Sequence, residues 1–287
     1  MDNHLPIEYL RLALMSTVPF DIYSLGSEAV MRLFQETKSH IGSVKIELVT
    51  NGNYSRSQQG PPAATTSIFT HRPTILLVES LDRERQIEAI AHELGHLLLV
   101  YRFGLGVVGF RMPHPDNSEE VFRYHSRTRE SWFDLLGQIP HTIHHSILVG
   151  YLEERYGIRS VHHLRLFQHH FQNDREEIGK DKHLSHARAL VAFEYEAMIG
   201  QVGKTIDFTK QPDSFQVAYR SAQKHFGNYG PASIPSPSGY RQDVLSFLED
   251  LGHPKEDFLF FPENHDAGKT DAQCKPMSSM YADSEMN

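Results

Sequence analysis

The spacing of hydrophobic residues changes between two periods along the first hundred positions. Residues 26–40 carry apolar side chains three and four positions apart, which predicts an amphipathic helix. Residues 43–50 alternate apolar and polar side chains, which predicts a half-buried strand, and residues 74–79 form a second short strand-like stretch. Residues 82–103 then show the strongest helical pattern, and from residue 97 onward the apolar side chains surround the helix. We therefore expect a helix whose second half is buried.

Helical spacing dominates the rest of the chain. Pro140 suits the first position of a helix, so we place a helix start there. Segments rich in Gly, Pro and Ser predict a surface loop at residues 51–67 and a linker at residues 230–239. The helices expected in this part of the chain span residues 140–156, 160–171, 181–199, 213–225 and 241–251.

This order of elements predicts an α+β fold, with a small core of helix, short sheet and helix followed by a mostly helical C-terminal part. We assign residues 1–110 to the core and residues 111–262 to the helical part. Residues 263–287 lack a hydrophobic period and are predicted to be a disordered tail. The aromatic run at residues 258–261 is expected to dock on the core as a terminal anchor, and a partner-binding segment is the alternative.

Composition excludes several classes of protein. With 39% hydrophobic and 22% charged residues, the chain can build a packed core, unlike a disordered or collagen-like chain. No unbroken apolar run is longer than that at residues 97–101, which is far shorter than the ~20 residues that cross a membrane. The N-terminus lacks the pattern of a secretory signal, and Cys274 is the single cysteine. Together with a net charge of -8, these features predict a cytoplasmic protein without nucleic-acid or membrane partners.

Histidine is over-represented, with 19 copies in the chain, and two of them form a motif. Residues 91–97, on the strongest helix, read AHELGHL, which contains HExxH. Residues four apart on a helix project in nearly the same direction, so His92 and His96 can bind one zinc ion. Glu93 is rotated by about 100° from His92 and can act as general base on a water at the metal. A pair of surface histidines is the alternative, but the flanking apolar residues argue against it because buried polar groups need partners.

Residues 31–101, in the order helix, strands and HExxH helix, resemble the minimal core of the zincin metallopeptidases. The compact order is similar to that of the ImmA/IrrE-type peptidases. The resemblance implies a zinc-dependent peptidase whose peptide substrate lies along an edge strand, here residues 74–79. It also implies a third metal ligand, which in the gluzincin branch is a glutamate on a later helix. The metzincin extension is excluded, because Leu99 and Arg102 stand where it needs Gly and His.

The motif leaves the third ligand open. We favour His145, because His141 and His145 share a helix face with two leucines and so belong to a partly buried stripe. Glu194 is the second choice, since it lies on a later amphipathic helix. The remaining candidates are His141, His144, Glu130, Glu153, Glu154 and Glu196.

Two further groups of residues carry side chains suited to a metal site or to catalysis. The histidine pairs at residues 162–163 and 169–170 recur at helical spacing, which fits a solvated helix face better than a second metal site. A peptidase of this kind also needs a group that stabilises the oxyanion. The candidates for that group are Tyr124, His125, Tyr151, Tyr195 and His186.

The sequence therefore predicts a zinc-dependent metallopeptidase that hydrolyses peptide bonds in a protein or peptide substrate. In this hypothesis His92, His96 and His145 bind zinc, while Glu93 activates water and then protonates the departing amine. One alternative is a non-catalytic regulatory or binding protein with a zincin-like fold. Another is a metal-dependent amidohydrolase that acts on a non-peptide substrate.

Overall fold

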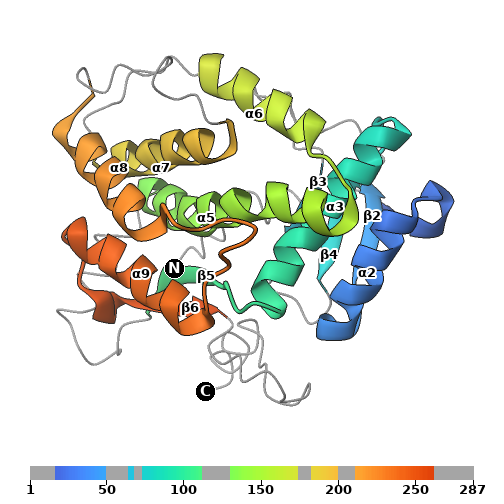
Figure 1. The fold of residues 1–287 in the computed structure, drawn as a ribbon, viewed down its shortest axis with the longest axis horizontal. Helices are drawn as coiled ribbons and strands as arrows, with labels where there is room; N and C mark the ends of the chain where they lie inside the picture. The colour runs from blue at the N-terminus through green and yellow to red at the C-terminus, as the bar shows by residue number, and fades with distance from the viewer. Residues whose placement is uncertain are drawn as a thin grey trace, which may run out of the picture. The chain divides into compact units, whose positions relative to one another are not determined.

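The computed structural model describes residues 17–49, 64–67, 73–111, 130–173, 182–199 and 211–261 (Figure 1). The chain divides into two units, with the boundary between Leu94 and Gly95. This boundary lies inside helix α3 (Arg83–Tyr101), whereas the sequence placed it at residue 110. Within the described ranges, no helix combines the length and the apolar character needed to cross a membrane.

The first unit contains a four-stranded sheet with the strand order β1-β2-β4-β3. Its central pair, β2 (Lys45–Val49) and β4 (Thr74–Val78), is parallel and occupies the two segments that predicted strands. β1 (Thr17–Pro19) and β3 (Ala64–Ser67) are the antiparallel edges. The expectation that residues 74–79 form an edge strand is therefore wrong, because β3 pairs with the outer side of β4.

The prediction of a surface loop at residues 51–67 is wrong at its end, where β3 forms. This strand reads Ala-Thr-Thr-Ser and lacks the alternating apolar pattern of the two central strands. Its backbone pairs with β4. Backbone hydrogen bonds do not depend on side-chain type, so an edge strand can form without a hydrophobic period in its sequence. Pattern analysis therefore detects the central strands and misses the edges.

Side-chain hydrogen bonds to the backbone fix the beginnings of the helices of the first unit. α2 (Glu28–Ile41) is capped by Ser27, whose hydroxyl accepts a hydrogen bond from the Val30 amide. The beginning of α3 is fixed by Arg83, whose Nε donates to the Leu25 carbonyl at 2.9 Å. Both helices match the segments in which the hydrophobic period predicted them.

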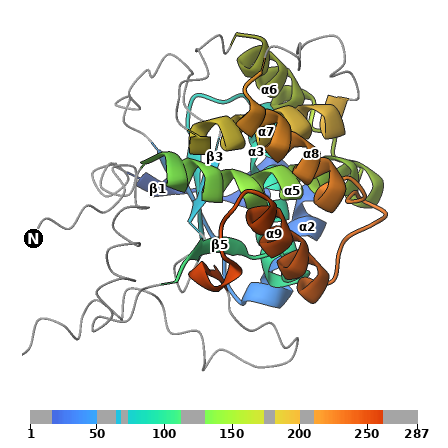
Figure 2. The ribbon, with the colours of Figure 1, turned by 90° about the vertical axis from the view of Figure 1, so that its left-hand side faces the viewer.

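The second unit is mostly helical. Its longest helix, α5 (Glu130–Tyr156), packs against α7 (Lys182–Ile199), and α7 lies beside α8 (Asp213–Phe226) in both views (Figures 1 and 2). α9 (Pro237–Asp250) packs against α8, and α6 (Val161–Asn173) contacts α7. Together with the sheet of the first unit, these helices give the α+β class that the order of elements predicted.

The predicted start of α5 at Pro140 is wrong, because this proline lies inside the helix. An interior proline removes one backbone hydrogen bond and costs about 3 kcal/mol. Burial outweighs this cost, since Trp132, Leu135 and Ile139 on the turns before the proline are at most 3% exposed. Each such side chain contributes about 1.5–3 kcal/mol when fully buried.

The remaining helices follow their predictions closely. α3, α6, α7 and α8 each begin and end within about two residues of the predicted bounds. α9 begins sooner, at Pro237, because the Ser236 hydroxyl accepts a hydrogen bond from the Gly239 amide. The predicted linker at residues 230–239 is therefore shorter than expected.

A two-stranded antiparallel sheet in the second unit joins β5 (Val107–Phe110) to β6 (Phe258–Phe261). Phe258 and Phe260 are buried, at 3% and 7% exposed. The aromatic run thus docks on the protein as a strand, which confirms the prediction of a terminal anchor. The predicted tail at residues 263–287 lies outside the described residues.

We expect Tyr240→Phe to lower the free energy of unfolding by about 1–3 kcal/mol, because the buried Gly106 carbonyl loses the hydroxyl that donates to it. Burial raises the pKa of Tyr240, whereas the unfolded chain ionises near a pKa of about 10. The difference in the free energy of unfolding between the wild type and the variant should therefore be constant from about pH 6 to pH 9 and shrink above about pH 10. Urea unfolding across this range measures it, and an advantage that persists undiminished at higher pH would contradict the assignment.

α3 and α5 approach closely at Gly95, which belongs to the second unit together with α5. A Cβ atom at Gly95 would lie 2.2 Å from Cδ1 of Leu148, a fully buried residue. The missing side chain lets the two backbones approach at this point. As a result His96, the next residue of α3, reaches His144 and His145 on α5.

Gly95→Ala should lower the free energy of unfolding, because overpacking costs about 1–3 kcal/mol and the better helix propensity of Ala returns only about 1 kcal/mol. Leu148→Ala removes the side chain that the new methyl group meets. The double variant should therefore lose less free energy of unfolding than the two single variants lose in sum. Urea unfolding of the four proteins measures this coupling, and strictly additive losses would show that Leu148 does not limit the approach.

Candidate metal centre

His92 and His96 lie one turn apart on α3, which runs unbroken across the boundary between the two units. Their side chains therefore project in nearly the same direction, as the HExxH spacing predicts. His92 is buried, at 8% exposed, whereas Glu93 and His96 are partly exposed. The motif thus combines one shielded histidine with two side chains that solvent reaches.

α5 brings two further histidines to His96. The Nε2 atoms of His96 and His145 are 3.2 Å apart, and the Nδ1 atoms of His96 and His144 are 3.1 Å apart. His145 is fully buried, and His144 is 3% exposed. One ring nitrogen from each of His92, His96 and His145 lies within 4.8 Å of the other two, so a single metal ion can contact all three.

A buried glutamate on α7 orients His145. Oε1 of Glu194 lies 2.6 Å from Nδ1 of His145, on the side of the ring away from His96. Oε2 of Glu194 accepts hydrogen bonds from the Gln138 amide at 2.8 Å and from the Thr142 hydroxyl at 3.1 Å. Glu194 is fully buried, so its carboxylate needs these donors. They hold it in place as the acceptor for the Nδ1 proton of His145.

His144 fixes the orientation of His96. Nε2 of His144 lies 2.7 Å from the carbonyl oxygen of Leu105, which can only accept a hydrogen bond. The proton of neutral His144 is therefore on Nε2, and its Nδ1 has a lone pair. Nδ1 of His96 must then donate the hydrogen bond that joins the two rings.

These partners assign the tautomers of the two facing rings. The proton of His145 is on Nδ1, toward Glu194, and the proton of His96 is on Nδ1, toward His144. In their neutral forms both rings therefore present a lone pair at Nε2, and the two lone pairs face each other across 3.2 Å. Two acceptors at this distance repel each other unless a cation lies between them. The arrangement suits a metal ion or one shared proton.

Burial lowers the pKa of His144 and of His145 and so favours their neutral forms. It lowers the pKa of His144 to about 4, against the opposing effect of the hydrogen bond to Leu105. Burial, reinforced by the neighbouring histidines, holds the pKa of His145 well below its ordinary value of 6.5. Metals bind only an unprotonated imidazole nitrogen, so this state is the one that binds a metal. The low pKa of His145 disfavours a proton on its Nε2 and leaves this nitrogen available to a metal ion.

The distance between the His96 and His145 nitrogens agrees with tetrahedral coordination by imidazole. Zinc binds imidazole nitrogen at about 2.0–2.1 Å, so two ligands on a tetrahedral ion are about 3.3–3.4 Å apart. The Nε2 atoms of His96 and His145 are separated by nearly this distance, 3.2 Å. Glu194 beyond His145 matches the common carboxylate–histidine–metal arrangement, in which the carboxylate fixes the tautomer. The group can hold a metal ion, although other ions that bind imidazole fit it as well as zinc does.

The structure brings the three predicted ligands His92, His96 and His145 into one group, and their binding of a metal stays a prediction. Glu194, the second choice, contacts His145 from the opposite side of its ring. His141, His145 and Glu194 form a further set of potential ligand atoms within 4.8 Å of one another. His141 is on the exposed side of this set, with its Nδ1 3.4 Å from Oε2 of Glu194.

The other candidate glutamates have different surroundings. Glu153 and Glu154 are exposed on α5, and Glu153 forms an ion pair with Arg159 at 3.1 Å. Glu196 accepts a hydrogen bond from the hydroxyl of Tyr219. The residues whose side chains lie outside the described part are Glu130, Tyr124 and His125.

The described oxyanion candidates also have other neighbours. Tyr151 packs edge-on against Phe103, and the buried Tyr195 lies against Phe167. His186 belongs to a separate group of histidines. The structure therefore favours none of them for a role beside His96.

The prediction of a solvated face is wrong for His163 on α6. Its ring packs edge-on against His145, with the centroids 4.7 Å apart, and stacks on Phe167. Burial lowers the pKa of His163 to about 4. His169 on the same helix is exposed, as predicted, and the side chain of His170 lies outside the described residues. His163 thus packs a neutral ring against His145.

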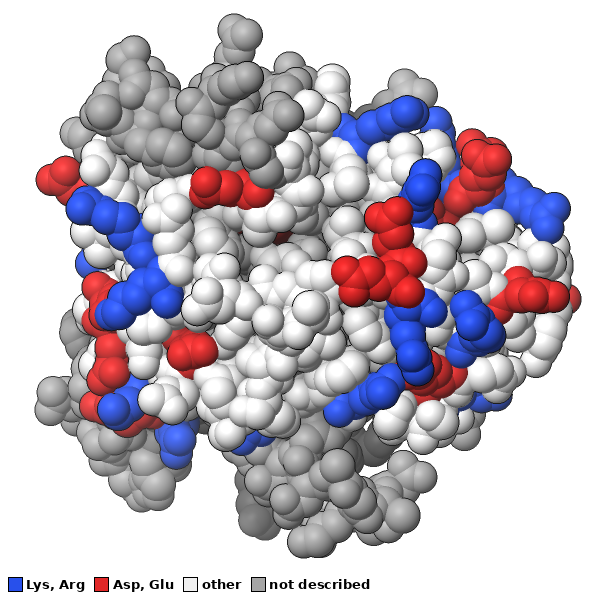
Figure 3. All heavy atoms as spheres, in the orientation of Figure 1, with Lys and Arg blue, Asp and Glu red and all other residues white. Residues whose placement is uncertain are grey.

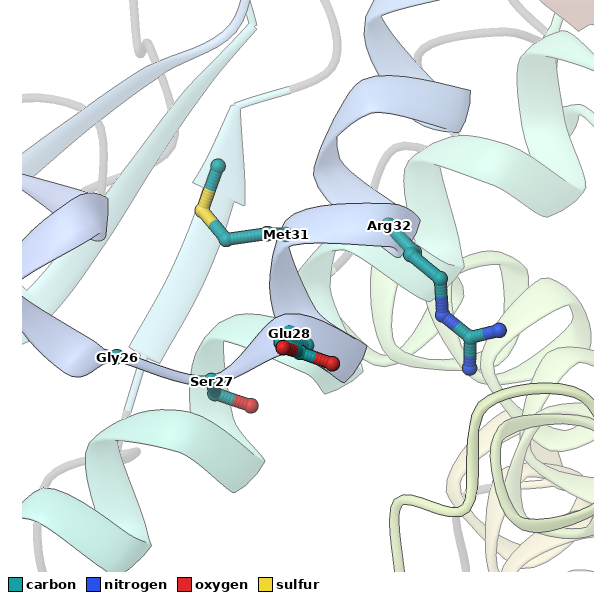
Figure 4. Close-up of a pocket in the computed structure, with 5 residues that line it drawn as sticks. All are labelled: Gly26, Ser27, Glu28, Met31 and Arg32. Atoms are coloured by element: carbon teal, nitrogen blue, oxygen red, sulfur yellow. The ribbon is translucent and has the colours of Figure 1, made fainter.

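A shallow hollow in the first unit lies at the start of α2 (Figure 4). Met31 and Arg32 on its rim point in different directions, so the lining side chains do not converge as they do in a binding site. Basic and acidic side chains are interspersed on the face drawn in Figure 3. Neither feature offers the convergent polar groups that the histidine cluster provides. The hollow is lined by Gly26, Ser27, Glu28, Met31 and Arg32.

No protein-family model, no curated protein sequence and no solved structure matches this chain. The candidate site is therefore supported by its own geometry and not by inheritance from a relative. The resemblance to zincins rests on the HExxH pattern and on the order of elements around it.

Sequence reasoning named His144 and Glu194 only as possible ligands, and it missed their roles as orienting residues. The sequence contains a signal for the role of Glu194, because this residue stands between apolar residues on a helix and a buried glutamate needs a partner. His144 leaves none, since its partner is a backbone carbonyl in the loop after α3. Both roles depend on contacts between segments that are distant along the chain.

Glu194→Gln should weaken zinc binding by about 10- to 100-fold, because His145 loses the carboxylate that fixes its tautomer. The size of the side chain is kept, so the fold should be preserved. Competition between the metal-free protein and a coloured chelator measures the affinity. The matched control is Glu153→Gln, an exposed substitution on α5 that should leave the affinity unchanged. Equal affinities for the two variants would contradict the orienting role.

Proposed function

We propose that this chain is a zinc-dependent hydrolase that cleaves peptide bonds. The observation that carries the proposal is the 3.2 Å separation between the Nε2 atoms of His96 and His145, two rings whose Nδ1 atoms are bonded to other partners. In this proposal His92, His96 and His145 hold the metal. Glu194 orients His145 and neutralises part of the charge that the metal adds.

Three imidazole ligands suit hydrolysis. A zinc ion with three protein ligands keeps a fourth position for water, lowers the pKa of that water to about 7 and polarises a carbonyl group. His92 and His145 present their nitrogens from buried positions, whereas His96 is partly exposed. The cluster is thus shielded on one side and accessible on the other, as a site that admits a substrate must be.

Glu93 is the general base in this proposal. It follows His92 directly, so it projects about 100° away around the helix axis and lies beside the ligand positions. Its partial exposure leaves it in contact with solvent. Its carboxylate accepts a proton from the attacking water and returns it to the departing amine. A purely structural metal site has no use for a carboxylate at this position.

A non-catalytic metal site is the second candidate function, and one observation favours it. His145 and Glu194 are fully buried, as in structural sites that exclude solvent. A non-peptide amide would need the same residues as a peptide, so the choice of peptides rests on the resemblance to zincins. An experiment on Glu93 separates catalytic from structural use.

Glu93→Gln should leave zinc binding intact and reduce peptide hydrolysis by about 10²–10⁴-fold, because the amide cannot accept the proton. The measurement is the cleavage of a mixture of fluorogenic peptides by the zinc-loaded protein, with zinc content determined on the same samples. Glu84→Gln, an exposed substitution in the first turn of α3, is the matched control and should keep full activity.

Each result of this comparison has a defined meaning. Retained cleavage in Glu93→Gln would refute Glu93 as the base. Zinc binding without cleavage in the wild type would favour the non-catalytic alternative. A zinc content in His96→Ala and His145→Ala that equals that of the wild type would show that neither histidine holds the metal.

A further inference from the structure

A second group of histidines lies in the second unit and shares no residue with the candidate centre. His183 and His186 are three residues apart on α7, and His253 follows the end of α9. One ring nitrogen from each lies within 4.8 Å of the other two. His186 is fully buried, and His253 is 9% exposed. Three imidazoles thus converge in a place that is largely closed to water.

The backbone places His253 by the geometry of a helix end. Its amide donates to the Leu248 carbonyl at 2.9 Å, and the amide of Gly252 donates to the Glu249 carbonyl at 2.8 Å. This pair of bonds is a Schellman motif, in which Gly252 adopts a left-handed φ of 85°. His253 is therefore held in a defined position, which lowers the entropic cost of binding a ligand.

α5, α7 and the end of α9 meet around these histidines. Lys182, next to His183, donates through Nζ to the Leu251 carbonyl at 3.2 Å and so joins the start of α7 to the end of α9. From α5, the ring of Trp132 covers the group, with its centroid 4.0 Å from that of His183 and 4.4 Å from that of His253. Trp132 is 3% exposed, so it closes this side of the group to solvent.

We propose that His183, His186 and His253 form a second metal site, which binds a divalent ion of the zinc type and fastens α7 to the end of α9. Three neutral imidazoles favour ions of intermediate softness such as Zn²⁺, Co²⁺, Ni²⁺ and Cu²⁺, whereas Mg²⁺ and Ca²⁺ prefer oxygen ligands. The group contains only histidines among the described residues, with no carboxylate to act as a base. Its role is therefore structural, and it does not depend on the proposed hydrolytic function.

Trp132 makes this site directly observable, because it is the only tryptophan of the chain. Bound Co²⁺ has a partly filled d shell and quenches the fluorescence of an indole ring a few ångströms away. Metal-free protein without a histidine tag is titrated with Co²⁺ while tryptophan emission is recorded. The wild type should lose more than half of its emission, whereas His183→Gln and His253→Gln should each keep most of it.

Two controls separate this site from the candidate centre. His145→Gln removes a proposed ligand of that centre and should keep the quenching, as should His40→Gln, an exposed substitution on α2. Circular dichroism checks that each variant is folded, and the partial exposure of His183 makes its substitution the milder of the two. Zinc analysis should find one equivalent less in His183→Gln than in the wild type, whatever the zinc content of His145→Gln.

The proposal also predicts stabilisation by the metal. Zinc should raise the midpoint of thermal unfolding of His145→Gln, because an ion that binds only the folded state stabilises it, and the double variant with His183→Gln should lose this rise. The proposal is overturned if Co²⁺ leaves Trp132 emission unchanged in the wild type. It is equally overturned if His183→Gln and His253→Gln quench like the wild type, or if His145→Gln abolishes the quenching.

Discussion

The Nε2 atoms of two imidazole rings, 3.2 Å apart on α3 and α5, are the constraint on which the candidate centre depends. Each ring is oriented by a partner on its far side: Glu194 fixes His145, and His144, bonded to the Leu105 carbonyl, fixes His96. Burial lowers the pKa of His144 and His145, and the two facing nitrogens, when both are acceptors, need a cation between their lone pairs. The direction of these hydrogen bonds supports a metal site more strongly than the number of histidines does.

Helix packing sets the conditions for this arrangement. Gly95 lets α3 approach Leu148 on α5, and the next residue along α3 is His96. α7 then supplies Glu194, whose burial is compensated by donors on α5. Removing one member of such a network leaves a buried polar group without its partner, which costs more than the bond itself contributes. The packing of three helices and the chemistry of the site are therefore coupled.

The two histidine groups differ in the features that distinguish catalytic from structural metal sites. In the group on α3 and α5, Glu93 directly follows His92 along the helix, and both Glu93 and His96 are partly exposed. The group on α7 and the end of α9 is covered by Trp132. Catalytic sites keep an open coordination position and a base, whereas structural sites are closed. This contrast is the physical basis for proposing different roles for chemically similar clusters.

The sequence by itself determined the features that depend on neighbouring residues. The hydrophobic period located α3, α7 and α8, and the HExxH spacing placed His92 and His96 on one face of a helix, because these patterns repeat within a few turns. It placed His145 on a partly buried helix face but left it one candidate among several. The start of α5 and the strand β3 were missed, since burial overrode Pro140 and backbone pairing gave β3 no hydrophobic period.

Only the tertiary structure decided which histidines meet. His145 contacts His96 and Glu194, and each of these residues lies on a different helix and far from it along the chain. His253 likewise joins His183 and His186 only because a helix end carries it there. Local patterns indicate which face of a helix is buried. Packing between distant segments decides which other element covers that face. For that reason the sequence predicted a metal-binding motif, and the fold determined the rest of the site.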